Sequence, residues 1–141
     1  MVIVSRDRIG SMDCSVHRLP GGGSKVHDSY GLRIVSFGRG GRGMPGRTPY
    51  PRYFEFYCIS HMFEGKGYFW TPKGSMADVE PGQGVLVPPG FIHCYGGWDD
   101  YYIEDTVCFW GPVADCLFTS GLFKAGGARI GSERRRLPKI V

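Results

Sequence analysis

Two segments near the middle of the chain carry polar side chains that could bind a small molecule. His93 and Tyr95 stand two residues apart, and a later segment alternates Tyr102, Glu104 and Thr106 with other residues. Residues two apart on a β-strand point to the same face, so each set is expected to share one face. A neutral imidazole can both donate to and accept from a ligand hydroxyl, and a carboxylate favours an amine or a polyhydroxylated ligand.

Each of these residues also has an ordinary structural interpretation. His93 can be a buried histidine of the core, and Tyr95 can be a core aromatic whose hydroxyl has a partner. For Glu104 a surface carboxylate is the favoured interpretation, because acidic side chains are seldom buried without a partner. The residue types alone therefore leave both interpretations open.

The elements that must position these residues are short strands separated by turns. The 23 glycines and 10 prolines cluster between apolar runs, as expected where many short strands need many turns. We expect strands over residues 2–4, 34–37, 53–62, 68–71, 75–79, 85–87, 91–95 and 101–110. A helix is expected to begin at Pro112 and to end at Gly121. The pattern predicts an all-β sandwich or barrel with a short C-terminal helix.

The 141 residues fit one domain with its own core. Residues 1–52 are expected to form an N-terminal arm, the first strands and a glycine-rich loop. The loop is placed at residues 39–47, which hold too much glycine for the interior of a strand. Residues 53–121 are expected to form the barrel core and its helix, and residues 122–141 a basic linker toward a C-terminal region that this chain does not include.

Composition argues against several other classes of protein. The net charge is +4, and the basic residues are spread between two segments, residues 39–52 and 134–139. In neither segment do they alternate with aromatics as in a nucleic-acid groove. The five cysteines include no CxxC pair, and no run approaches the ~18 apolar residues of a membrane span. We therefore expect a cytoplasmic protein that contacts neither membrane nor nucleic acid through this chain.

Residues 81–93, with the sequence PGQGVLVPPGFIH, resemble the second motif of the cupin family. Gly82, Pro88, Gly90 and His93 match that motif at every spacing. The glycines permit two tight turns around one short strand, and the second turn delivers His93 into the barrel interior. The resemblance implies a cupin-type double-stranded β-helix, which is a jelly-roll barrel.

The metal site of the cupin family is mostly missing. The first cupin motif supplies His-x-His and a glutamate, whereas residues 54–64 contain one histidine, His61, and end at Glu64. Cys94 adjoins His93 and should point to the opposite face. We therefore expect no metal, no cofactor and no catalytic residue. The alternative is a small metal-dependent cupin enzyme, an isomerase or a dioxygenase, in which His93 would be a ligand.

A cupin barrel without metal ligands resembles the effector-binding domain of AraC-family transcription regulators. Residues 88–95 resemble the family's Pro-Pro-Gly-x-x-His-x-Tyr signature, and residues 57–69 resemble its strand and Gly-x-Gly hairpin. Residues 109–123 resemble its Phe-x-Gly-Pro, helix and Gly-Leu-Phe continuation. Together these matches cover about residues 53–129.

This resemblance implies a sensor rather than an enzyme. The implied ligand is a small polar, sugar-like effector held inside the barrel. The implied ligand-binding residues are His93, Tyr95, Arg52, Tyr102, Glu104 and Thr106. Arg52 matches the family's arginine, although a charge at the barrel rim is equally consistent. Thr106 stands where the arabinose sensor has a stacking aromatic, which argues against arabinose itself.

The resemblance also implies how a sensor of this kind would act. It implies a homodimer formed by helices beyond the barrel, an N-terminal arm over residues 1–23 that closes on the ligand, and DNA binding by a domain absent from this chain. A barrel that dimerises without any effector is the remaining alternative.

Overall fold

The computed structural model describes residues 4–9, 12–22, 25–43, 50–74, 76–98 and 101–122, with side chains from Cys14 onward. Strands dominate these residues. The strands are β1 (Val4–Ile9), β2 (Met12–His17), β3 (Arg33–Gly43), β4 (Arg52–Phe54), β5 (Tyr57–Glu64), β6 (Gly67–Trp70), β7 (Ala77–Val79), β8 (Gly84–Val87), β9 (Cys94–Gly97) and β10 (Tyr102–Trp110). Two short helices, α1 (Lys25–Tyr30) and α2 (Pro112–Thr119), accompany them.

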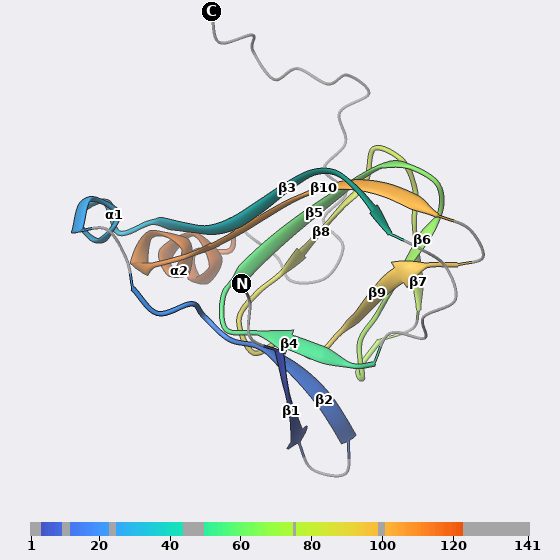
Figure 1. The fold of residues 1–141 in the computed structure, drawn as a ribbon, viewed down its shortest axis with the longest axis horizontal. Helices are drawn as coiled ribbons and strands as arrows, with labels where there is room; N and C mark the ends of the chain where they lie inside the picture. Colours follow the sequence, from blue (N-terminus) through green and yellow to red (C-terminus); the bar gives the residue numbers. More distant parts are fainter. Residues whose placement is uncertain are drawn as a thin grey trace, which may run out of the picture.

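The strands form three small sheets around a common interior (Figure 1). The largest has the order β3-β10-β5-β8, the second β7-β6-β9 and the third β1-β2-β4. All pairings between these strands are antiparallel except that of β2 with β4, which is parallel. This arrangement confirms the predicted all-β, cupin-type fold with a short C-terminal helix.

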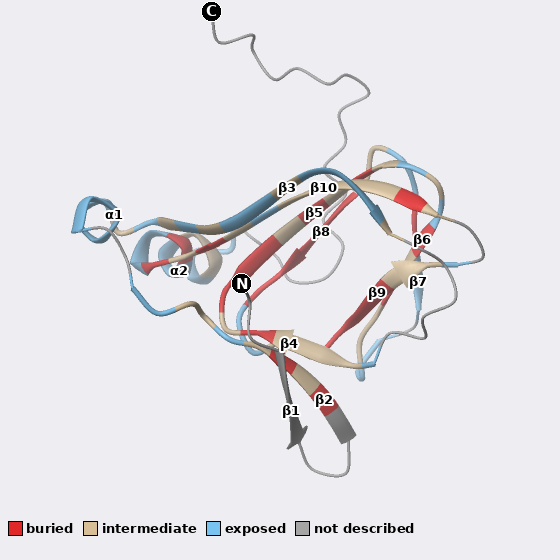
Figure 2. Ribbon diagram, in the orientation of Figure 1, coloured by how far each residue is buried: buried red, intermediate tan, exposed pale blue. Residues whose placement is uncertain are grey.

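The core lies between the sheets and is built from alternating positions of the strands. Along the chain from β4 into β5, Phe54, Phe56, Cys58 and Met62 face this interior, together with residues of β6, β8, β9 and β10. Burying one aliphatic or aromatic side chain of this kind contributes about 1.5–3 kcal/mol. Figure 2 shows the buried positions concentrated on β5, β8 and β9, whereas β3 is a largely exposed edge strand.

A second apolar cluster lies on the other face of the four-stranded sheet. Tyr57, Leu86, Phe109 and Ala114 pack together there, which attaches α2 to the sheet. The hydroxyl of Tyr57 also donates to the Asp115 carboxylate at 2.8 Å. The alternation of β5 between these two clusters is the period of two that a strand with two buried faces requires.

The structure confirms the predicted helix boundaries. α2 begins at Pro112, directly after Gly111, and its C-cap Ser120 is followed by Gly121 with φ of 79°. A left-handed residue after the C-cap is the usual way to end a helix, and glycine adopts that conformation without strain. Gly111 has φ of 134°, and a Cβ there would lie 2.4 Å from the carbonyl oxygen of Gly31.

The predicted glycine-rich loop is wrong for residues 39–43, which continue β3. The glycines serve close packing against β10 rather than flexibility: a Cβ on Gly43 would lie 2.2 Å from the Tyr102 ring, and one on Gly38 would lie 2.9 Å from Thr106 Oγ1. Side-chain bulk on β3 would therefore displace two of the proposed ligand-binding residues. Residues 44–47 of the predicted loop lie outside the described residues.

The N-terminal region is more structured than the sequence indicated. β1 and β2 form a hairpin, β2 adds to β4, and the short helix α1 precedes β3. None of β2, its pairing or α1 was predicted. The predicted strand over 53–62 is interrupted at Glu55, whose carboxylate accepts hydrogen bonds from the Leu19 backbone N–H at 2.8 Å and from Arg18 at 2.9 Å.

Two further predictions differ from the structure or cannot be compared with it. Gly96 and Gly97 were expected in a turn but belong to β9, because they pair with Tyr68 and Gly67 of β6. The predicted basic linker lies outside the described residues beyond Leu122. Neither α1 nor α2, the helices of the described segments, has the length and apolar character needed to span a membrane.

Candidate ligand-binding site

The segment that carries His93 is positioned by two glycine turns on either side of β8. Gly82 and Gly90 have φ values of 85° and 73°, a region that favours glycine. The Gly82 N–H donates to the Met62 carbonyl and the Gly90 N–H to the Phe54 carbonyl, both at 2.8 Å. These bonds fix the segment before β8 against β5 and the segment after β8 against β4, as the predicted turns require.

His93 is the most deeply buried polar side chain of the described barrel, at 1% exposure. Its Nδ1 lies 2.9 Å from the carbonyl oxygen of Phe91, and its Nε2 lies 3.3 Å from Arg52 Nε. These partners define the tautomer, because Nδ1–H must donate to the carbonyl and Nε2 must accept from the guanidinium. Burial lowers the pKa of His93 to about 4, so the imidazole is neutral at physiological pH.

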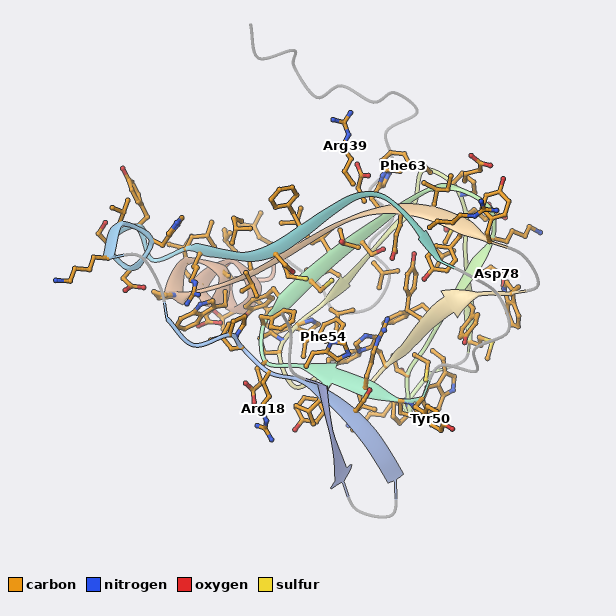
Figure 3. The ribbon with its side chains drawn as sticks, viewed as in Figure 1. Arg18, Arg39, Tyr50, Phe54, Phe63 and Asp78 are labelled. Carbon is orange, nitrogen blue, oxygen red and sulfur yellow. The ribbon has the colours of Figure 1, made fainter. Side chains whose placement is uncertain are left out.

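Aromatic rings surround this imidazole. Phe54 meets it edge to face at a centroid distance of 4.8 Å, and Phe69 stacks on it at 6.0 Å. Figure 3 shows Phe54 pointing into the space between the sheets, whereas Arg39 and Phe63 point away from it. The predicted inward orientation of His93 is therefore confirmed.

Arg52 lies on β4 directly opposite His93. The two residues form an antiparallel bridge, and the Arg52 guanidinium lies 5.5 Å from the centre of the Phe54 ring. The half-buried Arg52 cation also lowers the pKa of Glu104 and of Tyr102, in each case against the larger effect of burial. Its guanidinium therefore contacts two buried side chains of the interior, His93 and Phe54.

A second polar cluster is formed by Glu104, Ser60 and Tyr95. The Ser60 hydroxyl donates to a carboxylate oxygen of Glu104 and lies 3.2 Å from the Tyr95 hydroxyl. Burial raises the pKa of Glu104, although hydrogen bonds from Ser60 and Tyr95 act in the opposite direction. Burial, followed by the Glu104 charge, raises the pKa of Tyr95 well above its usual range.

The expectation of a surface carboxylate at Glu104 is therefore wrong. Glu104 is paired across β5 with the fully buried Met62, and both residues face the interior. Acidic side chains are seldom buried without a partner, and Glu104 has two partners, the hydroxyls of Ser60 and Tyr95. These hydrogen bonds stabilise the buried carboxylate although no positive charge of the described residues is in direct contact with it.

Tyr102 and Thr106 complete the polar face of β10. Tyr102 is 9% exposed and meets Tyr95 edge to face at 5.7 Å. Burial raises the pKa of Tyr102 to about 12. Thr106 is half-buried and lies opposite Ser60, so it shares the inner face with it. All six proposed residues thus belong to one interior: Arg52 with His93 and Glu104 with Tyr95 form two hydrogen-bonded groups, and Tyr102 and Thr106 lie beside them.

Ser60 is the polar residue of this site that the sequence interpretation missed. Every second residue from Phe54 to Met62 faces the interior, and Ser60 occupies one of these positions. This alternation is the sequence signal that could have identified it. Serine is common in loops and caps, and a lone hydroxyl within an apolar series is easily taken for a surface residue.

Residues proposed as partners of His93 in a metal site do not gather around it. His61 lies opposite Asp105, on the face of β5 away from Ser60, and its ring packs edge to face on Phe63 at 4.6 Å. Within the described segments, no three His, Cys, Asp or Glu side chains are grouped so that they could hold an ion.

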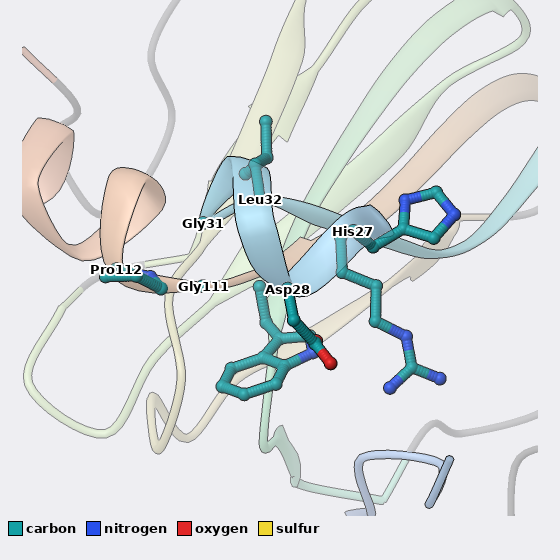
Figure 4. A pocket seen from close by; sticks show the side chains of 8 residues that line it. His27, Asp28, Gly31, Leu32, Gly111 and Pro112 are labelled. Atoms are coloured by element: carbon teal, nitrogen blue, oxygen red, sulfur yellow. The ribbon is translucent and has the colours of Figure 1, made fainter. Parts of the chain in front are cut away.

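A separate hollow of about 200 Å³ lies between α1 and the start of α2 (Figure 4). It is at the end of β10 away from Tyr102. Its lining residues are His27, Asp28, Gly31, Leu32, Arg33, Trp110, Gly111 and Pro112. The buried Nε1 of Trp110 has no hydrogen-bond partner among the described residues, a role that an ordered water can fill.

Comparisons with known proteins add little to this geometry. No family model matches the chain, and no curated protein matches it. Among solved structures, the chain is similar to KdgF from Halomonas sp., at 18% identity and a TM-score of 0.37, covering 55% of this chain and 77% of that one. The strand pairing gives this chain an all-β, cupin-type fold, and the buried polar groups form a candidate small-molecule site within it.

Proposed function

We propose that this domain binds a small polar, sugar-like molecule in its interior and serves as the effector-sensing part of an AraC-type transcription regulator. The observation that carries the proposal is the pairing of a buried neutral imidazole with an arginine on one side of the interior and a hydrogen-bonded buried carboxylate on the other. Few side chains of this kind are buried unless they bind something or one another.

The chemistry of the groups favours a ligand with several hydroxyls. The Glu104 carboxylate accepts hydrogen bonds, the Arg52 guanidinium donates them, and the Tyr95 hydroxyl can do both. Ser60 and Tyr95 fill part of the acceptor capacity of Glu104, and a ligand hydroxyl can replace one of them or use a remaining lone pair. The apolar rings of Phe54 and Phe69 beside His93 supply surface for the carbon skeleton of the ligand.

Signalling requires that the ligand favour one of two states of the protein. The parallel pairing of Ser15 with Arg52 connects β2 to the strand that carries a proposed ligand donor. A ligand that bonds to Arg52 would thereby stabilise the docking of the N-terminal hairpin. Dimerisation, DNA binding by an appended domain and a cytoplasmic location are part of the proposal through the family resemblance.

A thermal-shift screen of sugars, amines and organic acids tests ligand binding, because a ligand that binds only the folded state raises its stability. We expect a polyhydroxylated compound to raise the Tm of the wild type and to fail with Tyr95→Phe. Tyr57→Phe is the matched control, since it also removes a hydroxyl bonded to another side chain but on the α2 side of β5. Equal shifts in wild type and Tyr95→Phe would contradict the site.

Metal analysis separates the sensor from the metal-dependent enzyme that the cupin motif left open. Stoichiometric iron, manganese or zinc that is lost in His93→Ala would support the enzyme and contradict the sensor. We expect a folded protein whose ligand-induced shift is unchanged by a chelator.

A further inference from the structure

Two cysteines lie directly opposite each other on the central pair of strands. Cys58 on β5 and Cys108 on β10 are partners in the antiparallel register. Cys58 belongs to the buried core at 8% exposure, and the half-buried Cys108 packs against the same core. Both thiols therefore face the interior, and neither has a part in the ligand site described above.

The register places the two residues within the span of a disulfide. Directly opposite residues of an antiparallel pair have Cα atoms about 4.5–5.5 Å apart. Disulfides bridge Cα separations of about 4.4–6.8 Å. A bond between these two sulfurs therefore needs side-chain rotation without separation of the strands.

The two thiols are already in contact and differ in character. Cys58 hydrogen-bonds Cys108, and this bond is the main reason why the pKa of Cys108 is lowered and that of Cys58 is raised. Ser36 also hydrogen-bonds Cys108 and lowers its pKa further, against the effects of burial and of Glu104. Cys108 is therefore the more acidic thiol of the pair.

Access also distinguishes the two sulfurs. Cys108 lies on the strand next to the edge of the sheet, opposite Ser36 of the edge strand β3, and Ser36 is exposed. Cys58 is only 8% exposed, whereas Cys108 is half-buried, so a small oxidant reaches Cys108 more easily than Cys58. An accessible thiolate beside a protected thiol is the arrangement found where one cysteine reacts and a second resolves the product.

We propose that Cys58 and Cys108 are a redox-active pair that closes to a disulfide when Cys108 reacts with a hydroperoxide. The Cys108 thiolate attacks the terminal peroxide oxygen, the O–O bond breaks, and the departing alkoxide takes a proton to become an alcohol. Cys108 is then a sulfenic acid. The Cys58 sulfur attacks the Cys108 sulfur, the S–O bond breaks, and the released hydroxide takes the Cys58 proton to leave as water.

The sum is two thiols and one hydroperoxide giving one disulfide, one alcohol and one water. A dithiol reductant reverses the reaction by exchange through a mixed disulfide. The new bond would join β5 to β10 one inward position away from Ser60 and Thr106. The pair is independent of the proposed ligand and can be tested without it.

The test uses the full chain, fully reduced and then treated with equimolar hydrogen peroxide at neutral pH. Remaining thiols are alkylated under denaturing conditions, and the product is digested with trypsin and a protease that cleaves before aspartate. These enzymes release Cys58 in residues 53–66 and Cys108 in residues 105–114, apart from the other three cysteines. We expect these two peptides to be joined, 2 Da lighter than their sum, and separated by a dithiol.

Matched variants determine whether the folded pair is responsible. Cys116 is an exposed cysteine of α2, so Cys116→Ser should leave the yield of the joined peptides unchanged. Cys108→Ser should abolish it, and Cys58→Ser should trap Cys108 as a sulfenic acid that a dimedone probe labels. We expect Cys108 to be consumed about tenfold faster than Cys116, because the thiolate is the reactive form.

Several results would overturn the proposal. One is that Cys58 and Cys108 stay alkylatable in the folded wild type while Cys116 is oxidised. Another is that the joined peptides form no faster in the folded chain than in urea. If Cys58→Ser fails to fold, dimedone labelling of the wild type in the first seconds after peroxide replaces it, and absence of label on Cys108 then counts against the proposed attack.

Discussion

Arg52 and His93 are bonded to each other through both backbone and side chains. The Arg52 N–H donates to the His93 carbonyl at 3.0 Å, the His93 N–H donates to the Arg52 carbonyl at 2.9 Å, and Arg52 Nε donates to His93 Nε2 at 3.3 Å. Paired backbone bonds hold both Cα atoms in place, so the side chains have little freedom to separate. The pair is therefore positioned before any ligand arrives, which reduces the entropy lost on binding.

His93→Gln should reduce the loss of stability in mild acid. The pKa of His93 falls from 6.5 to about 4 on folding because burial disfavours the cation. Between these pH values the unfolded chain binds more protons than the folded one, so the free energy of unfolding falls as the pH falls. The contribution of His93 is up to about 3 kcal/mol.

Urea denaturation at several pH values between 7 and 4 measures this effect. The variant should show a shallower decline in the free energy of unfolding than the wild type. His27→Gln is the matched control, since it removes an imidazole that is exposed in the folded chain. An identical decline in His93→Gln and wild type would mean that the buried imidazole is not the cause.

Glu104→Gln should stabilise the protein and weaken its binding of a polyhydroxylated ligand. The raised pKa of Glu104 shows that burial disfavours its charge, and an amide removes that charge while its oxygen still accepts from Ser60. We expect a gain on the order of 1 kcal/mol at pH 7, which is a few degrees in Tm. Binding should weaken because a neutral acceptor replaces a charged one.

Asp105→Asn provides the comparison for Glu104→Gln. Asp105 is the next residue of β10, and its carboxylate accepts from the Gly40 N–H at 2.6 Å. This variant should lower stability slightly and leave ligand affinity unchanged. Differential scanning fluorimetry should therefore show a higher Tm for Glu104→Gln and a slightly lower Tm for Asp105→Asn. Calorimetric titration should show weaker ligand binding in Glu104→Gln alone. A loss of stability in Glu104→Gln would show that its charge is favourable in the folded protein.

Gly43→Ala should be strongly destabilising, whereas Gly41→Ala should be tolerated. A Cβ on Gly43 would overlap the Tyr102 ring at 2.2 Å, while one on Gly41 has only a contact at 3.7 Å with the Glu104 carbonyl oxygen. Overlap with a buried ring costs about 1–3 kcal/mol through forced shifts. Equal urea midpoints for the two variants would contradict the packing of Tyr102 against β3.

Ligand binding should slow the cleavage of the chain by trypsin after Arg18. This bond follows β2, and the N–H of Leu19 on its far side is bonded to Glu55 beside β4. A ligand that engages Arg52 should hold the segment closed, so we expect cleavage to slow several-fold, while cleavage at Lys73 in the turn before β7 stays constant. Unchanged cleavage after Arg18 at saturating ligand would remove the arm from the mechanism.

The parts of the fold that could be predicted from the sequence are those with local causes. The two turns around β8 follow from Gly82 and Gly90, and the limits of α2 follow from Pro112 and Gly121. These residues restrict or permit particular backbone conformations wherever they occur. Turn and helix boundaries of this kind can therefore be predicted without knowing which other segments of the chain lie nearby.

The parts that could not be predicted depend on contacts between distant segments. From the sequence alone, the glycines of β3 indicate a loop. The structure shows that Gly43 is needed in a strand, because the ring of Tyr102 occupies the space where its Cβ would lie. The burial of Glu104 depends on the hydroxyls of Ser60 and Tyr95, and Ser60 is 44 residues away in the sequence. The six proposed ligand-binding residues were placed by pattern and resemblance, and their roles in binding stay predictions.

The parallel pairing of β2 with β4 makes the first strands of the chain part of the frame that orients Arg52. The Ser15 N–H donates to the Pro51 carbonyl at 2.8 Å, immediately before the arginine, and residues 15–17 follow β4 along its whole length. A force or a partner that detached the hairpin would leave one edge of β4 bare and allow the guanidinium to turn away from the imidazole. Anything that engages the amino-terminal hairpin therefore has a direct mechanical route to the binding groups, without a change in the other two sheets.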